Sequence, residues 1–209
     1  AMGKKDHAIL LDTSDLSYEY APLELPHQKI IVTNSQKARL AVDERYQERQ
    51  AQCQEALHDL QTVIAIQNLS ELTADVFEQV QEMIRRPVCL RRARHAVTEN
   101  QRTIQAVEAL NKGDIREFGQ LMNASHLSLK EDFEVSCEEL DILVEEAWEI
   151  EGVLGSRMMG AGFGGCTISI VENDAVNEFV SRVGSHYKER TGRTAEFYIM
   201  ETGNGASEV

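Results

Sequence analysis

Apolar and polar residues alternate along three short segments near the start of the chain, and this pattern predicts extended strands. The segments place β-branched and aromatic residues between turn-prone clusters, and they cover 7–12, 17–23 and 29–35. Pro26 interrupts the pattern, because proline has no backbone N–H to donate to a strand ladder. We expect a helix to begin directly after these strands, with Asn34 or Ser35 as its N-cap.

The middle of the chain changes to the spacing of three and four residues between apolar positions that is typical of amphipathic helices. We expect helices over 36–61, 70–84, 87–110, 115–127 and 136–150. Their ends carry recognised start and stop signals. These are Ser70 as an N-cap, Pro87 in a first turn, Gly113 as a stop, Asp114 as an N-cap, and Ser136 with Glu139 as a capping box.

After Gly152 the spacing of apolar residues returns to two, which indicates strands. We expect strands at 153–159 and 166–171, joined by a glycine-rich loop, then a helix that is capped by Asn173 or Asp174 and ends at Gly192, and a last strand at 194–200. The whole order is strands, a block of helices, then strand–loop–strand–helix–strand. This order predicts an α+β fold, an antiparallel sheet with helices packed on one face.

Composition narrows the classes of partner and of site. The formal net charge is −14, so nucleic acid and anionic membranes are excluded as main partners, although a nucleotide needs only local donors. The four cysteines have no metal-ligand spacing, and the histidines form no paired motif, so no metal site is predicted. No apolar run approaches the roughly 18–20 residues of a membrane helix. Reduced thiols and no signal peptide are expected, as in a cytoplasmic protein.

Five glycines fall within 155–166, in the stretch "GSRMMGAGFGGC". Glycine is tolerated in a strand connection where the backbone needs a positive φ or where another group approaches too closely for a Cβ. One interpretation is a flexible hairpin with a bulge. The other is a backbone cradle for a phosphate or sugar, or a contact with another phosphate loop. It is neither a dinucleotide-binding fingerprint nor a Walker A loop, because a strand follows it and no G-K-[ST] is present.

The stretch "GSRMMGAGFGGCTISIV" resembles the third sequence motif of galactokinases, which belong to the GHMP small-molecule kinases. Three other segments are similar to galactokinase segments in the family's order, at 45–53, 91–102 and 113–144. The opening "AMGKKDHAILLDT" resembles the stretch that follows the family's catalytic aspartate. The resemblance covers nearly the whole chain, and the third motif and 113–144 are its most specific parts.

The resemblance implies a fold and a domain organisation. The fold is that of the GHMP kinase C-terminal domain, ferredoxin-like with helical insertions. Residues 1–35 would be strands that complete the N-terminal kinase domain, and 36–209 would form the C-terminal domain.

The resemblance also implies an activity, namely ATP-dependent phosphorylation of galactose to galactose 1-phosphate by the intact protein. ATP and Mg²⁺ would be held by parts upstream, because the family's sugar motif, phosphate loop and catalytic aspartate are not found in this sequence. The chain alone is then expected to be inactive and to bind no cofactor. The alternatives are a non-catalytic galactose and ATP sensor, a structural fragment, or another GHMP kinase.

Site residues follow from the matched motifs. Tyr46 lies in "RYQERQAQC", which resembles the family pattern Y-N-x-R-R-x-x-C, and it would hydrogen-bond the sugar; Gln47 and Gln50 depart from the pattern. The glycine loop would pack against the phosphate loop through Gly160, Ala161, Gly162, Phe163, Gly164 and Gly165. Met159 replaces a threonine that is common in the family.

The remaining candidates are expected to be structural. Arg157 should pair with a core carboxylate, His95 and His126 should be held by local hydrogen bonds, and Cys166 should be a small buried residue. The basic run 85–94 is predicted to be a solvated helix face. Expected partners are galactose and ATP, together with self-association through an exposed apolar surface between domains.

Overall fold

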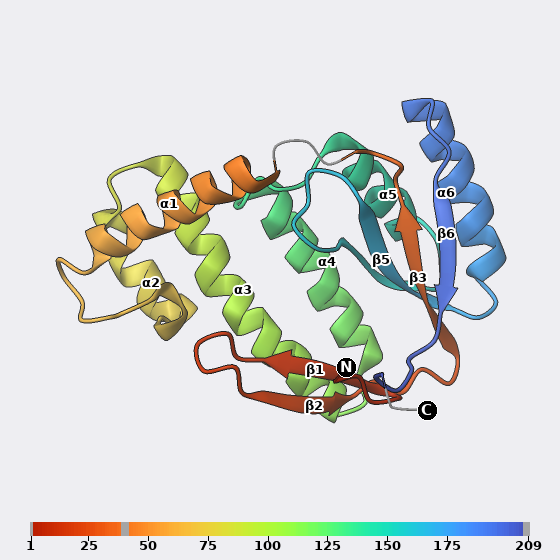
Figure 1. Ribbon diagram of the computed structural model, residues 1–209, viewed down its shortest axis with the longest axis horizontal. Helices are drawn as coiled ribbons and strands as arrows, with labels where there is room; N and C mark the ends of the chain where they lie inside the picture. Colours follow the sequence, from red (N-terminus) through yellow and green to blue (C-terminus); the bar gives the residue numbers. More distant parts are fainter. Residues whose placement is uncertain (1, 39–41, 207–209) are drawn as a thin grey trace.

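The glycine loop joins two strands of a four-stranded antiparallel sheet (Figure 1). The computed structural model describes residues 2–38 and 42–206. The strands lie in the order β4-β5-β3-β6. Their bounds are β3 Gln28–Asn34, β4 Val153–Met158, β5 Cys166–Glu172 and β6 Glu196–Met200. Strands and glycine loop therefore lie where the alternating pattern predicts them.

Two further strands form a separate hairpin, β1 His7–Leu11 and β2 Tyr18–Pro22. Its inner face packs on the C-terminal end of the long helix α3, in a cluster that contains Ala21, Leu23 and Leu110. The hairpin runs beneath the helices in Figure 1. It is thus attached to the helical part of the molecule and shares no ladder with the central sheet.

The described chain also contains six α-helices and two short 3₁₀ turns. The helices are α1 Val42–Leu60, α2 Ala74–Val80, α3 Pro87–Asn111, α4 Ile115–Glu131, α5 Glu138–Trp148 and α6 Val176–Thr191. The 3₁₀ turns are η1 Leu69–Glu71 and η2 Gln81–Met83. Helices α1, α2 and α3 share a hydrophobic cluster of their own, which includes Leu60, Phe77 and Val97.

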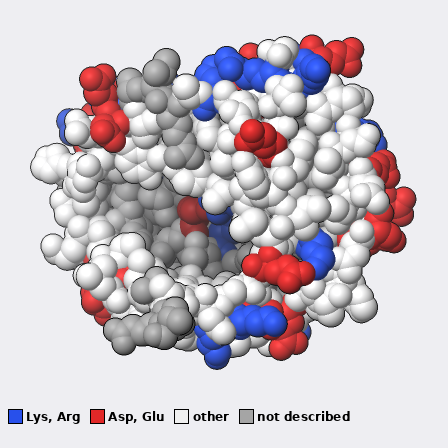
Figure 2. All heavy atoms as spheres, turned by 45° about the vertical axis from the view of Figure 1, so that its right-hand side comes forward, with Lys and Arg blue, Asp and Glu red and all other residues white. Residues whose placement is uncertain are grey.

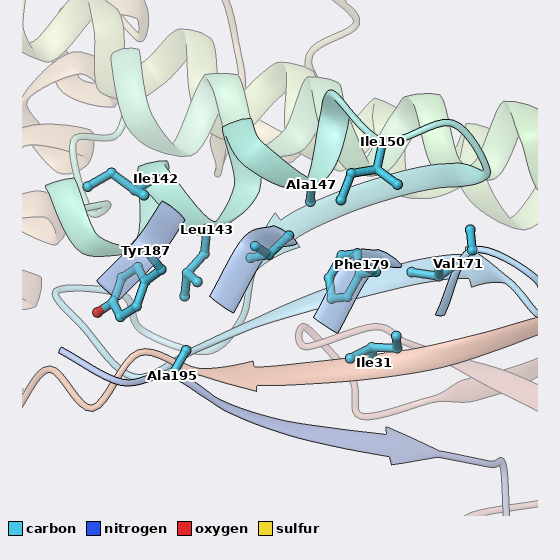
Figure 3. Packing of buried hydrophobic residues seen from close by; sticks show 11 residues of the cluster. Ile31, Ile142, Leu143, Ala147, Ile150, Val171, Phe179, Tyr187 and Ala195 are labelled. Atoms are coloured by element: carbon cyan, nitrogen blue, oxygen red, sulfur yellow. The ribbon is translucent and has the colours of Figure 1, made fainter. Parts of the chain in front are cut away.

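Helices α5 and α6 cover one face of the central sheet. Figure 3 shows Phe179 and Tyr187 of α6 and Leu143 of α5 on the same side of β3, and the three share one hydrophobic cluster. Ile31 of β3 and Val171 of β5 complete this core from the sheet side, and both are fully buried. Burying such side chains contributes about 1.5–3 kcal/mol each. The expected layer of helices on one face is confirmed for α5 and α6.

Helix α4 lies against the edge strand β4, and two glycines make this approach possible. A Cβ on Gly119 would lie 2.2 Å from the carbonyl oxygen of Leu154, and one on Gly155 would lie 2.3 Å from the carbonyl oxygen of Gly119. Because the two backbones touch, β4 is fixed to α4 just before the glycine loop begins.

Several helix ends differ from the sequence prediction. Helix α1 begins at Val42, so Asn34 and Ser35 do not cap it; Asn34 ends β3, and the Ser35 hydroxyl donates to the Gly165 carbonyl at 2.6 Å. The predicted helix segment 39–41 lies outside the described residues. Ser70 lies in η1, and Thr73 caps α2 by accepting from the N–H of Val76.

Two more caps are corrected, while three signals are confirmed. Cys137 is the N-cap of α5, because the Ser136 hydroxyl donates to Asp141 instead. Ala175, which makes no side-chain cap hydrogen bond, is the N-cap of α6 in place of Asn173 or Asp174. The confirmed signals are Pro87 in the first turn of α3, Asp114 as the cap of α4, and the left-handed Gly192 after α6.

The boundary predicted at residue 35 remains a prediction. Strand β3 lies inside 1–35. It pairs along its full length with β5, and from Ile30 to Asn34 it also pairs with β6. The ladder of β3 is therefore part of the same sheet as the strands of 36–209, while the β1–β2 hairpin forms its own sheet.

Candidate functional site

The glycine loop between β4 and β5 is a folded backbone structure. Five of the six positions in 160–165 have a positive φ, which is 72° at Gly160, 80° at Gly162, 58° at Phe163, 126° at Gly164 and 87° at Gly165; Ala161 is the exception. Side chains rarely adopt this conformation, so the loop needs glycine at most of these positions. The loop joins the antiparallel strands β4 and β5 as a hairpin, and β4 carries an irregularity between Val153 and Gly155.

Close approach adds a second reason for glycine at two positions. A Cβ on Gly162 would lie 2.1 Å from the Val135 carbonyl oxygen, and one on Gly164 would lie 2.8 Å from the Lys37 carbonyl oxygen. The loop is therefore clasped by two other segments, 132–135 on one side and 35–38 on the other.

Backbone hydrogen bonds hold the loop in this position. The Phe163 N–H donates to the Val135 carbonyl at 2.8 Å, and the Gly165 N–H donates to the Lys37 carbonyl at 3.3 Å. The Ser35 N–H and hydroxyl both donate to the Gly165 carbonyl, at 2.9 and 2.6 Å. Segments that are far apart in sequence thus converge on the loop.

Tyr46 lies beside this loop on the first turns of α1. Its side chain is 46% exposed, and its ring meets the edge of the Phe133 ring at a centroid distance of 6.2 Å. A hollow of about 420 Å³ opens at this point. It is lined by Val42, Asp43, Tyr46, Gln47, Gln50 and Ala161. Of the predicted site residues, the structure therefore brings Tyr46 and Ala161 to one hollow, while Gly162 and Gly164 pack against the chain itself.

Phe163 and Arg45 connect α1 to the glycine loop. The Phe163 ring is buried in a cluster with Val135, Leu140 and Met158. The Arg45 guanidinium lies 5.0 Å from the centre of that ring, a cation–π contact. The start of α1, which carries Tyr46, is thus held directly over the loop.

Arg49 has a role that the sequence pattern did not identify. Its Nε donates to the Phe133 carbonyl at 2.8 Å, and its Nη2 donates to the Glu134 carbonyl at 3.1 Å. Arg49 thereby fixes the segment 132–135, which contacts both Tyr46 and the glycine loop. Its match to the family pattern was the only signal in the sequence.

The basic run 85–94 is not a uniform solvated face. Arg92 is only 1% exposed and donates from Nε to the Gln52 side chain at 2.8 Å. The prediction is wrong at this residue because Arg92 lies on the inner side of α3 beside the buried Ala93 and Cys89.

The other predicted structural residues are placed as expected, except for Cys166. Arg157 lies 3.6 Å from a Glu99 oxygen, and His126 Nδ1 accepts from the Met158 N–H at 3.2 Å. His95 Nδ1 lies 2.9 Å from the Ser128 hydroxyl, and burial lowers the pKa of His95 to about 4. Cys166 is half-buried, not fully buried.

Charged side chains of both signs lie on the described surface of this acidic protein. On the face drawn in Figure 2, acidic and basic side chains are interspersed around a hollow. Among residues 2–38 and 42–206, no three His, Cys, Asp or Glu side chains converge as a metal site. In the same residues, no helix has the length and apolar character to cross a membrane.

Comparison with known proteins finds similarity to one family and to several of its members. Residues 106–189 match the family described as "GHMP kinases C terminal". The whole chain is 51% identical to a galactokinase of Levilactobacillus brevis over 208 residues and 54% identical to one of Fusobacterium nucleatum over 209 residues. The chain spans only 54% of the length of each of these relatives.

Solved structures agree on the fold. The structure of Lactococcus lactis galactokinase complexed with galactose superposes with a TM-score of 0.94 at 44% identity, covering 100% of this chain and 54% of that chain. A mevalonate kinase of L. major in complex with R-mevalonate gives a TM-score of 0.61 at 20% identity, covering 95% of this chain and 50% of that chain. The second similarity bears on the fold alone.

Proposed function

We propose that the chain belongs to the GHMP kinases, that it is the C-terminal half of a galactokinase, and that it forms one wall of a galactose site. The matched family and the galactokinase relatives support this proposal. In the intact protein, the reaction is phosphoryl transfer from ATP to galactose, which yields galactose 1-phosphate. The observation that carries this proposal is the hollow shared by Tyr46 and the glycine loop. The similarity to a galactokinase solved with galactose supports the choice of sugar.

Each part of the hollow has a distinct task in this proposal. The half-exposed Tyr46 phenol is a polar group on a rigid apolar ring, which suits it to orient a sugar hydroxyl. The glycine loop offers close backbone approach beside the phosphate-binding part of the site. Phosphoryl transfer depends on positioning and charge stabilisation, so a rigid wall contributes by fixing the acceptor.

ATP use is typical of the family, and Mg²⁺ accompanies ATP in such reactions. The described residues gather no set of carboxylates or histidines that fits a metal ion.

The proposal is tested in a joined protein, in which residues 1–209 replace the matching part of the L. brevis galactokinase. We expect galactose-dependent ATP consumption by the joined protein and none by the 209-residue chain alone, because one wall does not enclose the phosphoryl group. A joined protein that folds and binds ATP yet never consumes it with galactose would contradict the proposal.

Tyr46→Phe in the joined protein removes one neutral hydrogen bond to the sugar. We expect kcat/KM for galactose to fall by about threefold to tenfold. The matched control is Tyr198→Phe, because Tyr198 is 47% exposed but bonds Glu196 on β6. Equal effects of the two substitutions would exclude a sugar contact at Tyr46.

The remaining partner and location proposals rest on the surface and the cysteines. The outer face of the β1–β2 hairpin exposes large apolar side chains, which supports self-association of the isolated chain. The four cysteines are all free thiols, which supports a reducing, cytoplasmic location.

A further inference from the structure

The segment 132–135 lies between the two parts of the proposed galactose site. On one side, the Phe133 ring meets the Tyr46 ring. On the other side, the Val135 carbonyl accepts from the Phe163 N–H at 2.8 Å and leaves no room for a Cβ on Gly162. The distance between Tyr46 and the glycine loop therefore depends on where this segment lies.

A buried arginine holds the segment from behind. Arg92 of α3 donates from Nη1 to the Asp132 carbonyl at 2.5 Å and from Nη2 to the Glu134 carboxylate. Its Nε donates to Gln52 of α1 at 2.8 Å. A single guanidinium thus binds two points of the segment and the helix that carries Tyr46.

Further observations show that the segment has an unfavourable backbone conformation, which contacts with its surroundings maintain. Glu134 has a φ of 54°, a left-handed conformation that a residue with a side chain keeps only where its surroundings hold it. Arg49 binds the Phe133 and Glu134 carbonyls from α1, and Arg91 reaches the Glu134 carboxylate at 2.9 Å from the solvent side. The Arg92 hydrogen bond is the largest cause of the lowered pKa of Glu134.

Burial of the charged Arg92 side chain costs free energy of desolvation. A buried charge loses its hydration, and an apolar side chain of similar volume often stabilises a fold as well or better. What an apolar side chain does not supply is three directed donors that join α1 and the segment 132–135.

We propose that Arg92 is a positioning residue, which sets the geometry of the galactose site by tying α1 and the segment 132–135 together. It touches no ligand and acts through Phe133 on Tyr46 and through Val135 on the glycine loop. The proposal rests on the proposed function for its consequence in catalysis. The structural linkage itself is measured without any sugar.

The test is amide hydrogen exchange, followed by NMR, on the 209-residue chain and its variants. In Arg92→Met, we expect the Phe163 and Val135 amides to exchange about tenfold faster or more. Methionine cannot make the Arg92 hydrogen bonds to Asp132 and Glu134, so the segment 132–135 opens more often. Gly165, which is bonded to Lys37, and Ile170 in β5 serve as internal references and should keep their rates. Equal acceleration of all four amides would mean a general loss of stability and would overturn the proposal.

Further variants keep the test decisive if Arg92→Met fails to fold. Arg92→Lys keeps the charge but not the three directed donors, and Glu134→Gln removes the charge of a half-exposed partner. Both should accelerate Phe163 exchange. The matched control is Arg91→Met, since Arg91 contacts the same carboxylate but is more exposed; it should change the rate less than twofold. Unchanged Phe163 exchange in both Arg92→Lys and Glu134→Gln would also overturn the proposal.

A kinetic readout in the joined protein links the network to catalysis. There, Arg92→Lys should raise KM for galactose, while Arg91→Met should not. If exchange responds but the joined protein is inactive, the proposed function fails and the linkage stands. If the joined protein is active and exchange does not respond, the linkage fails alone.

Discussion

His95 illustrates how burial decides the chemistry of a single residue here. Its ring stacks on Phe133 at a centroid distance of 4.5 Å, and its Nδ1 lies beside the Ser128 hydroxyl. Burial is the main cause of its pKa of about 4, against an ordinary value of 6.5. The side chain is therefore a neutral packing group behind the site, as its place in a helix suggested.

This pKa predicts a dependence of stability on pH. Between pH 6.5 and 4 the unfolded chain binds a proton at His95 that the folded chain does not, so stability falls as the pH is lowered through this window. From pH 7 to pH 5 the loss from this residue should be about 2 kcal/mol. Urea unfolding of wild type and His95→Asn at both pH values measures it. An identical loss in the variant would contradict the assignment.

Arg92 and Gly162 show the limits of residue patterns at this scale. The clustered glycines predicted a loop with positive φ, and the structure has it. The sequence did not say what approaches Gly162, because Val135 lies 27 positions away. Arg92 belonged to a basic run that favours solvent exposure. The signal for its burial was its place among Cys89, Ala93 and Val97, which form the inner stripe of α3.

At the scale of elements, the sequence determines the positions of strands along the chain better than it determines helix caps. The alternating segments located all six strands, because side chains of a half-buried strand alternate whatever its partner. Caps were less predictable, because a serine can bond to a distant group instead. Ser35, which directly follows β3, bonds to Gly165, which is 130 residues away, and so it does not start a helix.

The cap of α2 gives a direct test at this scale. The Thr73 hydroxyl accepts from the Val76 N–H at 3.3 Å, whereas Ser70 donates to the Asn68 side chain. Thr73→Ala should lower the free energy of unfolding by about 1 kcal/mol. Ser70→Ala should lower it by about 0.5 kcal/mol or less. Urea denaturation of both variants decides, and the reverse order would favour Ser70 as the cap.

At the scale of the whole molecule, the outer face of the β1–β2 hairpin is largely exposed, although the Lys4 ammonium lies 5.3 Å from the centre of the Tyr20 ring. Ile9 lies opposite Tyr20, and Leu11 lies opposite Tyr18, so four large exposed side chains share this face. The pattern of alternation predicted both strands. It did not predict their separation from the central sheet, because strand pairing over long sequence distances leaves no local signal.

This face predicts self-association of the isolated chain. The average mass in sedimentation equilibrium should rise with concentration, and Leu11→Lys should reduce the rise by placing a charge on the apolar face. Met83→Lys is the control, since Met83 is similarly exposed but lies in η2. A constant monomer mass over the whole concentration range would contradict this prediction.

The claim that Tyr46 and the glycine loop form one wall of a galactose site is tested most directly by a crystal structure of the joined protein with galactose. The account predicts that the sugar occupies the hollow beside Tyr46 and Ala161, with the Tyr46 hydroxyl within about 3 Å of a sugar hydroxyl. Galactose bound elsewhere, with Tyr46 and the loop remaining in contact with solvent, would contradict it.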